Sequence, residues 1–186
     1  MDQELYDLIT RAKQGDKRAF ESLVNRYKRN VYYQAYGMLN DVMEAEDVLQ
    51  EAFIKAYFSL KELDSIYAFT SWLSRIVYHL CYDRLQKRKK VKTIVIDWLD
   101  KRNKQPIDSD SLIEQKQLQI DLHQAMQSLS SEHRAVLLLR EIQGLSYKEI
   151  AKIMRVPEGT VKSRIHAARL ALRNALKKRG DQDGAY

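Results

Sequence analysis

The sequence predicts an all-α protein of two small helical domains, and three observations support this prediction. Only six of the 186 residues are glycine and two are proline, the two residues that most often interrupt helices. Apolar residues recur at helical spacing along most of the chain, and runs typical of strands are few. The helical pattern breaks over residues 91–112, where Pro106 and a D-S-D-S run indicate a flexible linker. The expected division is a domain over 1–90, a linker over 91–112, a domain over 113–179 and a tail over 180–186.

Four helices are expected in the first domain. Gly15 is a typical stop for the first helix, and Asp16 is a good N-cap for the second. Asp41 and Glu44 form a D-x-x-E variant of the capping box before the third. Thr70 is a plausible N-cap for the fourth. These helices are expected over 2–14, 17–39, 42–59 and 71–90.

A helix-turn-helix is predicted near the C-terminal end. Ser146 and Glu149 make a capping box at the start of its first helix, and Pro157 suits the first position of its second. The second helix has one apolar side, formed by Val161, Ile165, Ala168, Leu172 and Leu176. The remaining arc carries Thr160, Lys162, Ser163, His166, Arg169 and Arg173. This pattern favours a DNA-recognition helix over the alternative, a solvated amphipathic helix of a bundle.

Charge is distributed in blocks, and the blocks favour a polyanionic partner. The net charge is +7, but residues 67–104 alone hold ten basic and three acidic groups. Residues 146–179 hold ten basic and two acidic groups, whereas the segments before, between and after these two blocks are net acidic. Two separate basic blocks suggest that one polyanion is held at two places.

The fourth helix of the first domain carries a second candidate nucleic-acid surface. A stripe at helical spacing combines cations, aromatic rings and an amide: Arg75, His79, Tyr82, Gln86 and Lys89. Such side chains can neutralise phosphates, stack on bases and hydrogen-bond to base edges. His79 taken alone fits an ordinary surface histidine equally well, and the basic run 87–90 fits a partner of the helix dipole.

The outward side of the third helix is a candidate docking surface for another protein. Asp47, Gln50, Glu51 and Ile54 fall together on the side opposite its apolar residues. An exposed isoleucine beside two carboxylates suits a basic, partly apolar partner. The alternative is ordinary solvated helix surface.

Several function classes find no support in the sequence. The single Cys81 excludes an internal disulfide and fits a reducing cytosol. No apolar run is long enough to span a membrane, and the first residues, MDQELYDLIT, do not resemble a signal peptide. The four histidines lie far apart without cysteine spacing, so we expect no zinc site. No cofactor-binding motif or catalytic constellation is visible, so we expect a non-enzymatic protein.

Four segments together resemble a known family. They are GDKRAFESLVNRY (15–27), AEDVLQEAFIKAY (45–57), FTSWLSRIVYHLCYDRLQKRKK (69–90) and LREIQGLSYKEIAKIMRVPEGTVKSRIHAARLALR (139–173). Each is moderately specific, but their order and spacing are specific to the family. The chain resembles an extracytoplasmic-function (ECF, group 4) sigma factor of the sigma-70 family from about residue 5 to residue 179.

The resemblance implies two helical domains, σ2 and σ4, and a role as a promoter-specificity subunit of bacterial RNA polymerase. The implied partners are the polymerase core, through its β′ clamp helices and β flap, promoter DNA, and an anti-sigma factor that is often membrane-anchored. A cytoplasmic location follows. The implied core-binding residues are Asp47, Gln50, Glu51 and Ile54. The implied contacts to the −10 element are Trp72, Arg75, His79, Tyr82, Asp83, Gln86, Lys87, Arg88 and Lys89. The implied contacts to the −35 element are Glu158, Thr160, Lys162, Ser163, Arg164, His166, Arg169 and Arg173.

Two departures from the family pattern concern promoter choice. His79 stands where family members often carry asparagine, and an imidazole lacks the paired donor and acceptor of an amide. Ala167 stands where many members carry arginine or lysine.

Two rival functions remain at this stage. A free-standing helix-turn-helix regulator accounts for residues 130–178 but leaves the first domain unexplained. A nuclease lacks the necessary carboxylate or histidine cluster.

Overall fold

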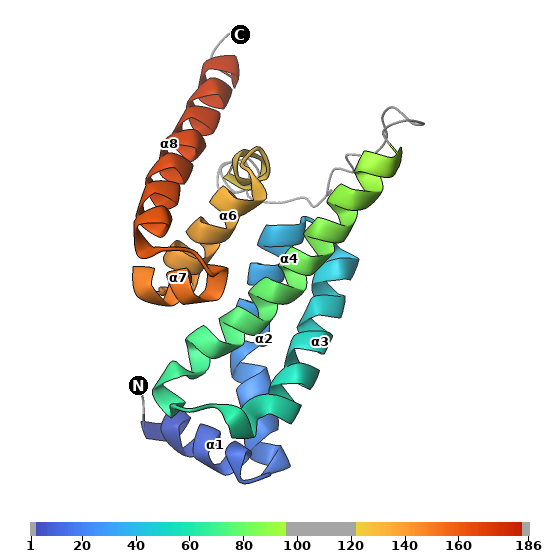
Figure 1. Ribbon diagram of the computed structural model, residues 1–186, viewed down its shortest axis with the longest axis vertical. Coiled ribbons are helices and arrows are strands. Elements are labelled where there is room, and N and C mark those ends of the chain that lie inside the picture. Colours follow the sequence, from blue (N-terminus) through green and yellow to red (C-terminus); the bar gives the residue numbers. More distant parts are fainter. Residues whose placement is uncertain (1–2, 96–121, 184–186) are drawn as a thin grey trace.

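The computed structural model describes residues 3–95 and 122–183, which form helices and turns without any strand in those ranges (Figure 1). The N-terminal half (residues 3–95) contains α1 (Gln3–Lys13), α2 (Lys17–Leu39), α3 (Val42–Ser59), η1 (Leu60–Glu62), η2 (Ile66–Ala68) and α4 (Phe69–Val95). The C-terminal half (residues 122–183) begins with helical residues 122–127. It continues with α6 (Ser131–Leu137), η3 (Leu138–Ile142), α7 (Tyr147–Met154) and α8 (Glu158–Asp183). The all-α prediction is confirmed. Most of the expected linker lies outside the described residues.

Local sequence signals place the first three helices where the sequence predicts them. The Asp16 carboxylate accepts hydrogen bonds from the backbone N–H groups of Arg18 and Ala19 at 2.9 and 3.1 Å. Asp41 accepts from the N–H of Glu44 at 3.0 Å and begins α3. Between α2 and α3, Asn40 adopts a left-handed conformation with φ of 53°, which asparagine tolerates better than most residues. The α2–α3 corner is therefore a tight turn with caps on both sides.

Both ends of α4 differ from the prediction. Thr70 is not its N-cap, because the short helix η2 leads directly into Phe69 and the Thr70 hydroxyl lies 3.2 Å from that of Tyr27. The helix also continues to Val95 instead of stopping near residue 90, since no glycine or proline interrupts it there. The predicted N-cap was wrong because α4 begins one residue before Thr70, whose hydroxyl lies against Tyr27 and not against the N–H groups of the helix.

α2 is the central helix of the N-terminal half and packs against α1, α3 and α4. Most of its buried side chains are apolar, and the exception is Gln34, which is 1% exposed. Gln34 satisfies its buried amide by donating from Nε2 to the backbone carbonyl of Ser74 at 3.0 Å. This bond fixes α4 against α2.

The helix-turn-helix is confirmed in its local chemistry. Ser146 and Glu149 form the reciprocal capping box at the start of α7. Arg155 ends that helix in a left-handed conformation with φ of 55°. Pro157 lies one position earlier than predicted: it is the N-cap of α8 and not its first residue, and its carbonyl accepts from the N–H groups of Thr160 and Val161. Val161, Ile165 and Ala168 are buried as predicted.

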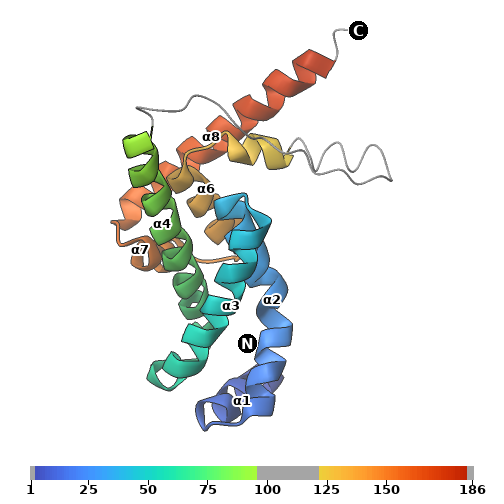
Figure 2. The same cartoon turned by 90° about the vertical axis from the view of Figure 1, so that its right-hand side faces the viewer.

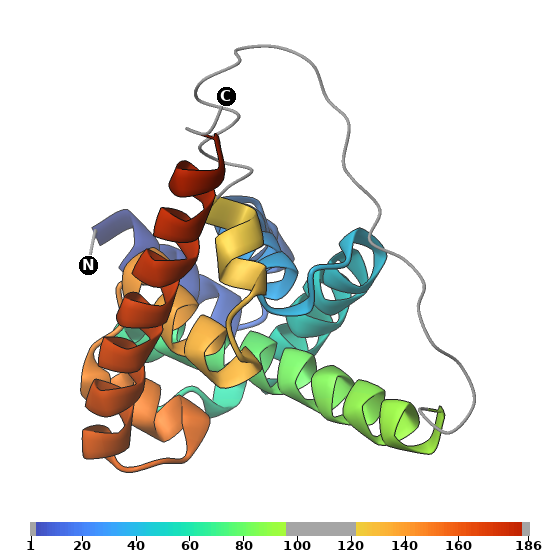
Figure 3. The same ribbon diagram turned by 90° about the horizontal axis from the view of Figure 1, so that it is seen from above.

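The two halves pack against one another. α2 lies against α6 and η3, and α4 lies against α7, so buried apolar residues of both halves form one continuous cluster (Figures 2 and 3). The halves approach closely at Gly37 of α2, where a Cβ added to the glycine would lie 2.8 Å from the Leu138 side chain. Glycine inside a helix costs roughly 0.5–1 kcal/mol relative to alanine. Here that cost is explained by the space that Leu138 needs.

Candidate nucleic-acid interface and docking surface

The outward side of α3 presents the residues that the sequence singled out for partner docking. Asp47 and Gln50 are exposed, and Ile54 is 57% exposed. Glu51 differs, because its carboxylate lies 3.2 Å from Lys55 and 3.1 Å from Arg84 of α4. Asp47, Gln50 and Ile54 therefore offer an open acidic and apolar surface, whereas Glu51 also holds α4 against α3.

A shallow cavity of about 210 Å³ lies between α3 and α4. Its lining combines cations, an imidazole, a carboxylate and two aliphatic side chains: Lys55, Arg75, Ile76, His79, Leu80 and Asp83. Three of these residues, Arg75, His79 and Asp83, belong to the predicted −10 set. An opening of this composition can take a planar polar group against the imidazole while cations stand at its rim.

The surroundings of His79 favour its uncharged form by lowering its pKa. Its partial burial lowers its pKa, and the positive charges of Arg155 and Arg75 lower it further, whereas Asp83 acts in the opposite direction. A neutral imidazole has one donor nitrogen and one acceptor nitrogen. His79 can therefore make one directed hydrogen bond of each kind, or stack, without adding a charge.

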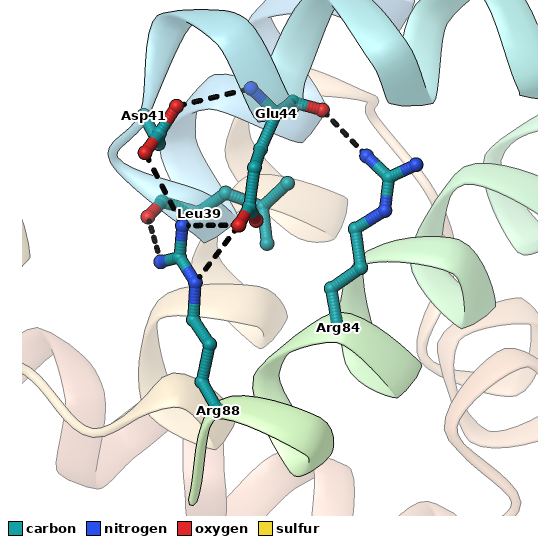
Figure 4. Close-up of polar contacts among 5 residues, drawn as sticks. All are labelled: Leu39, Asp41, Glu44, Arg84 and Arg88. Atoms are coloured by element: carbon teal, nitrogen blue, oxygen red, sulfur yellow. Dashed lines mark hydrogen bonds and ion pairs between the residues drawn. The ribbon is translucent and has the colours of Figure 1, made fainter. Parts of the chain in front are cut away.

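Arg88, also in the predicted −10 set, is engaged within the protein (Figure 4). Its guanidinium donates to the Leu39 carbonyl at 3.1 Å and pairs with Asp41 at 3.4 Å and Glu44 at 2.8 Å. Arg84 adds a bond to the Glu44 carbonyl at 2.7 Å. Together these two arginines tie α4 to the α2–α3 corner, so Arg88 serves the architecture at that corner.

The other predicted −10 residues differ in how they are presented. Trp72 is half-buried against the Phe69 ring, at 5.8 Å between centroids. Tyr82 is 36% exposed and stacks on Tyr78 at 5.8 Å. Lys89 lies 3.7 Å from the Glu132 carboxylate of α6. Arg75, Asp83 and Lys87 are exposed, whereas Gln86 is half-buried.

The predicted −35 residues share the N-terminal part of α8, and most of them face solvent. Lys162 pairs with Glu158 one turn earlier at 3.4 Å, and Arg169 pairs with Glu141 at 2.6 Å. Arg164 is half-buried, and its charge acts on Tyr78 of α4 and on Glu132 of α6. Thr160 is half-buried as well. The exposed members are Glu158, Lys162, Ser163, His166, Arg169 and Arg173.

Comparison with known proteins identifies the chain. Residues 23–91 match the family model for sigma-70 region 2, and residues 119–172 match that for sigma-70 region 4. The ECF RNA polymerase sigma factor SigW of Bacillus subtilis is 36% identical over 177 residues, covering 91% of this chain and 95% of the relative. The ECF RNA polymerase sigma-E factor of Escherichia coli is 35% identical over 189 residues, covering 95% and 97%. The chain belongs to the ECF sigma factors.

Solved structures agree with the fold of this sigma factor. The sigma factor RpoE of Bartonella quintana, in complex with the anti-sigma factor NepR, aligns with a TM-score of 0.66 and 25% identity, covering 85% of this chain and 96% of that one. CnrH in complex with the cytosolic domain of CnrY aligns with a TM-score of 0.68 at 23% identity, covering 94% and 98%, and supports the fold alone. As a sigma factor, the protein directs RNA polymerase to promoters, and the rival interpretation as a free-standing regulator is set aside.

Sequence reasoning missed three residues of the candidate interface of this sigma factor. Lys55 reaches the cavity from α3, one turn after Glu51, and Arg84 ties α4 to α3. Tyr78 is 5% exposed, and its burial raises its pKa to about 12. The i, i+4 spacing of Glu51 and Lys55 could have pointed to Lys55. The burial of Tyr78 depends on contacts between distant segments, which the sequence does not show.

The parts of the chain that the structure describes contain no cluster of three or more His, Cys, Asp or Glu side chains placed to hold a metal ion. Cys81 of this sigma factor is buried, and its burial raises the pKa of the thiol to about 12, so the thiol stays protonated. No helix in the described ranges is long and apolar enough to cross a membrane.

Proposed function

We propose that this sigma factor uses three surfaces, one after another. The α3 docking surface (Asp47, Gln50, Glu51 and Ile54) binds polymerase core, and the start of α8 reads the −35 element. The α3–α4 cavity and the exposed side of α4 then capture the −10 element. The observation that supports this proposal is the cavity, because its lining combines Arg75, His79 and Asp83 of α4 with Lys55 of α3. Polymerase would supply the chemistry, and this chain would act without catalysis of its own.

The α3 docking surface consists of Asp47, Gln50, Glu51 and Ile54. An exposed aliphatic side chain among acidic and amide groups fits a basic helical partner with an apolar stripe, which is the chemistry proposed for the β′ clamp helices. Glu51 is the weakest member, because Lys55 and Arg84 already neutralise part of its charge. We therefore expect Asp47, Gln50 and Ile54 to carry most of the affinity.

The cavity suits a base that has left the duplex. Extruding a base costs a few kcal/mol, which stacking and hydrogen bonding in the pocket must recover. The His79 ring can stack on a base and make a directed hydrogen bond with either ring nitrogen, and the cations Lys55 and Arg75 line the same cavity, where they could meet a phosphate. An asparagine would offer a paired donor and acceptor, so His79 is expected to change which base is preferred.

The exposed start of α8 would enter the major groove at the −35 element. Its cations, Lys162, Arg169 and Arg173, can contact phosphates, while Ser163 and His166 can reach base edges. Alanine at 167 removes one cation that many family members have, so phosphate contact would be weaker here by about one ion pair. The β flap of polymerase is the expected contact of the C-terminal half.

An anti-sigma factor is the expected regulator. One structure similar to this chain contains the anti-sigma factor NepR bound to a sigma factor, which supports a partner of that class. Anchoring of that partner in a membrane, and the cytoplasmic location of this chain, stay predictions.

Reconstituted transcription tests the proposal. Core polymerase with and without this protein would be incubated with genomic DNA, and the transcripts sequenced to map the promoter. Initiation at new sites that need the protein is expected, and initiation at the same sites without it would contradict the proposal.

A second experiment tests the α3 docking surface. Asp47→Lys should weaken capture of core polymerase on beads, and Glu51→Lys should weaken it too with some loss of thermal stability. Glu21→Lys makes the same charge reversal at an exposed position of α2 and serves as the control. Unchanged capture by Asp47→Lys, or an equal loss of capture by Glu21→Lys, would reject the assignment of this surface.

A further inference from the structure

The first helix of this sigma factor has no part in the proposed function, although it contacts the segment that joins the two helices of the −10 cavity. None of the residues assigned to polymerase or DNA lies in α1 (Gln3–Lys13). Its apolar side is buried through Leu5, Ile9 and Ala12. α1 packs on α2, and also on η1 and η2, the two short helices between α3 and α4 (Figures 1 and 2). α1 therefore supports the connection between the helices that line the cavity.

That connecting segment, residues 60–68, joins the two walls of the cavity. Lys55 of the lining lies near the end of α3, and Arg75 lies near the start of α4. Leu60 and Leu63 of the connecting segment are 2% and 4% exposed, so the segment is packed into the protein. The spacing of the walls at this end of the cavity thus depends on how the connecting segment is held.

Lys13, the last residue of α1, makes the first polar contact with the connecting segment. Its ammonium donates a hydrogen bond to the backbone carbonyl of Leu63, across 50 positions of sequence. Leu63 is buried and Lys13 is half-buried, and a buried carbonyl without a donor destabilises the fold. Without this ammonium the carbonyl would have to turn towards water, and the connecting segment would move with it.

A pair of tyrosines makes a second contact, near the other end of α1. The Tyr6 and Tyr67 rings lie 6.0 Å apart between centroids, with 49° between their planes, which is within the range of favourable aromatic pairs. Tyr67 belongs to η2 and is 73% exposed, so this contact lies outside the buried core. Lys13 and Tyr6 thus hold the connecting segment at two points, one in each of its halves.

The lining of the cavity comes from α3 and α4, so an effect of α1 on a bound base would be indirect. We infer that α1 is a positioning element of the −10 cavity: Lys13 and Tyr6 hold residues 60–68 so that the α3 and α4 walls discriminate between bases. The inference rests on the proposed function, since it takes this cavity as the site of the extruded base. A preorganised site discriminates better, because no binding energy goes into ordering it.

Loss of either contact should lower base discrimination more than promoter binding. Promoter binding also depends on the start of α8, which belongs to the other half of the protein. The preference for the best base, by contrast, depends on the walls of the cavity. Removing one hydrogen bond with a charged donor should reduce that preference by about threefold to tenfold.

Lys13→Met is the loosening variant, because methionine keeps a flexible unbranched side chain and removes the ammonium. Lys13→Arg keeps a cationic donor and should restore discrimination. Lys17→Met removes the same charge from an exposed lysine at the start of α2 and is the matched control. Tyr6→Leu removes the ring contact and leaves the Lys13 bond in place, so it tests the inference independently of the folding of Lys13→Met.

Run-off transcription by the holoenzyme measures the discrimination, on promoters that carry each base in turn at each position of the mapped −10 element. The measured quantity is the ratio of initiation rates between the preferred base and each of the others. The position read by the cavity is the one at which His79→Ala reduces this ratio. Urea unfolding and capture of core polymerase are measured beside it. A purely structural role of α1 would change those two values and overall activity, but not the ratio between bases.

Lys13→Met and Tyr6→Leu are expected to lower the ratio at that position by about threefold to tenfold, with wild-type capture of core. Lys13→Arg and Lys17→Met should keep the wild-type ratio. Unchanged ratios in Lys13→Met and Tyr6→Leu, or an equal loss in Lys17→Met, would overturn the inference while the proposed function stands. If Lys13→Met does not fold, the ratio for Tyr6→Leu decides. If His79→Ala itself leaves every ratio unchanged, the cavity is not the −10 site and the proposed function fails instead.

Discussion

The two helices assigned to DNA, α8 and α4, present similar residues in different ways. On α8 the proposed contacts Lys162, Ser163, His166 and Arg169 face solvent, and the ion pairs of the two cations are exposed. On α4, by contrast, Arg88 ties helices together within the protein, whereas Arg75 and Lys87 are exposed and the Lys89–Glu132 pair is as open as the pairs on α8. A cationic stripe on a helix therefore indicates DNA binding only after the internal partners of its cations are known.

The largest effect expected from this comparison is on stability. Arg88→Ala removes a bond to the Leu39 carbonyl and two carboxylate contacts, and should lower the free energy of unfolding by about 1–2 kcal/mol. Lys87→Ala, one position earlier and exposed, should change it by less than about 0.5 kcal/mol. Urea unfolding of both variants measures the difference. Equal unfolding midpoints would mean that Arg88 has no structural role and belongs with the DNA contacts after all.

A smaller effect is expected on −35 binding, where one internal partner can be removed without touching the cation. Arg169→Ala should weaken binding of the holoenzyme to the mapped promoter and reduce the salt dependence by about one ion, or roughly 0.9 in the log–log slope. Glu141→Gln frees Arg169 from its 2.6 Å pair and should strengthen binding up to a few-fold. Fluorescence anisotropy across a salt series measures both. The two substitutions must change promoter affinity in opposite directions. Weaker binding by Glu141→Gln would show instead that the Glu141–Arg169 pair positions Arg169 for DNA.

The difference between the two helices also shows what the sequence could predict. Capping residues placed α2, α3 and α7, because Asp16, Asp41 and Ser146 act on N–H groups within three residues of themselves. The apolar periodicity of α8 correctly separated buried Val161 and Ile165 from the exposed cations. Helix starts and the buried side of a helix depend on residues within a few positions of one another, so the sequence predicts them.

Contacts between residues far apart in the sequence could not be predicted, because no local pattern records them. Arg88 meets Leu39 and Asp41 across more than 40 positions of sequence, and the helical wheel of α4 gives no sign of that corner. Docking of the C-terminal half on α2 left one trace, the helix-interior Gly37, whose meaning depends on Leu138. Only the folded arrangement joins those two residues.

The smallest expected effect is a pH dependence of the contact between the halves. Burial, and secondarily the charge of Arg134, lower the pKa of His123, which also faces Tyr36 and Asn40. A histidine whose pKa is lower in the contact than outside it binds fewer protons there, so acid favours separation. The contact should be intact above the ordinary histidine pKa of 6.5 and weaken as the pH falls below it.

Fluorescence energy transfer between dyes on Asn25→Cys in α2 and Asn174→Cys in α8, both exposed, checks this between pH 8 and about 5.5. His123→Gln should make the transfer efficiency depend less on pH. The pH dependence that is left should come from His79, whose pKa is also lowered. A profile unchanged by His123→Gln would assign the pH dependence to other groups.

Permanganate mapping of melted thymines, run beside promoter-occupancy measurements, tests most directly whether α4 and α8 give polymerase two separate contacts with promoter DNA. Lys162→Ala on α8 should lower occupancy and leave the melted fraction of bound complexes unchanged. His79→Ala in the α4 cavity should leave occupancy nearly unchanged and lower that fraction. If both substitutions changed occupancy and melting in the same proportion, the division of labour between the two helices would be contradicted.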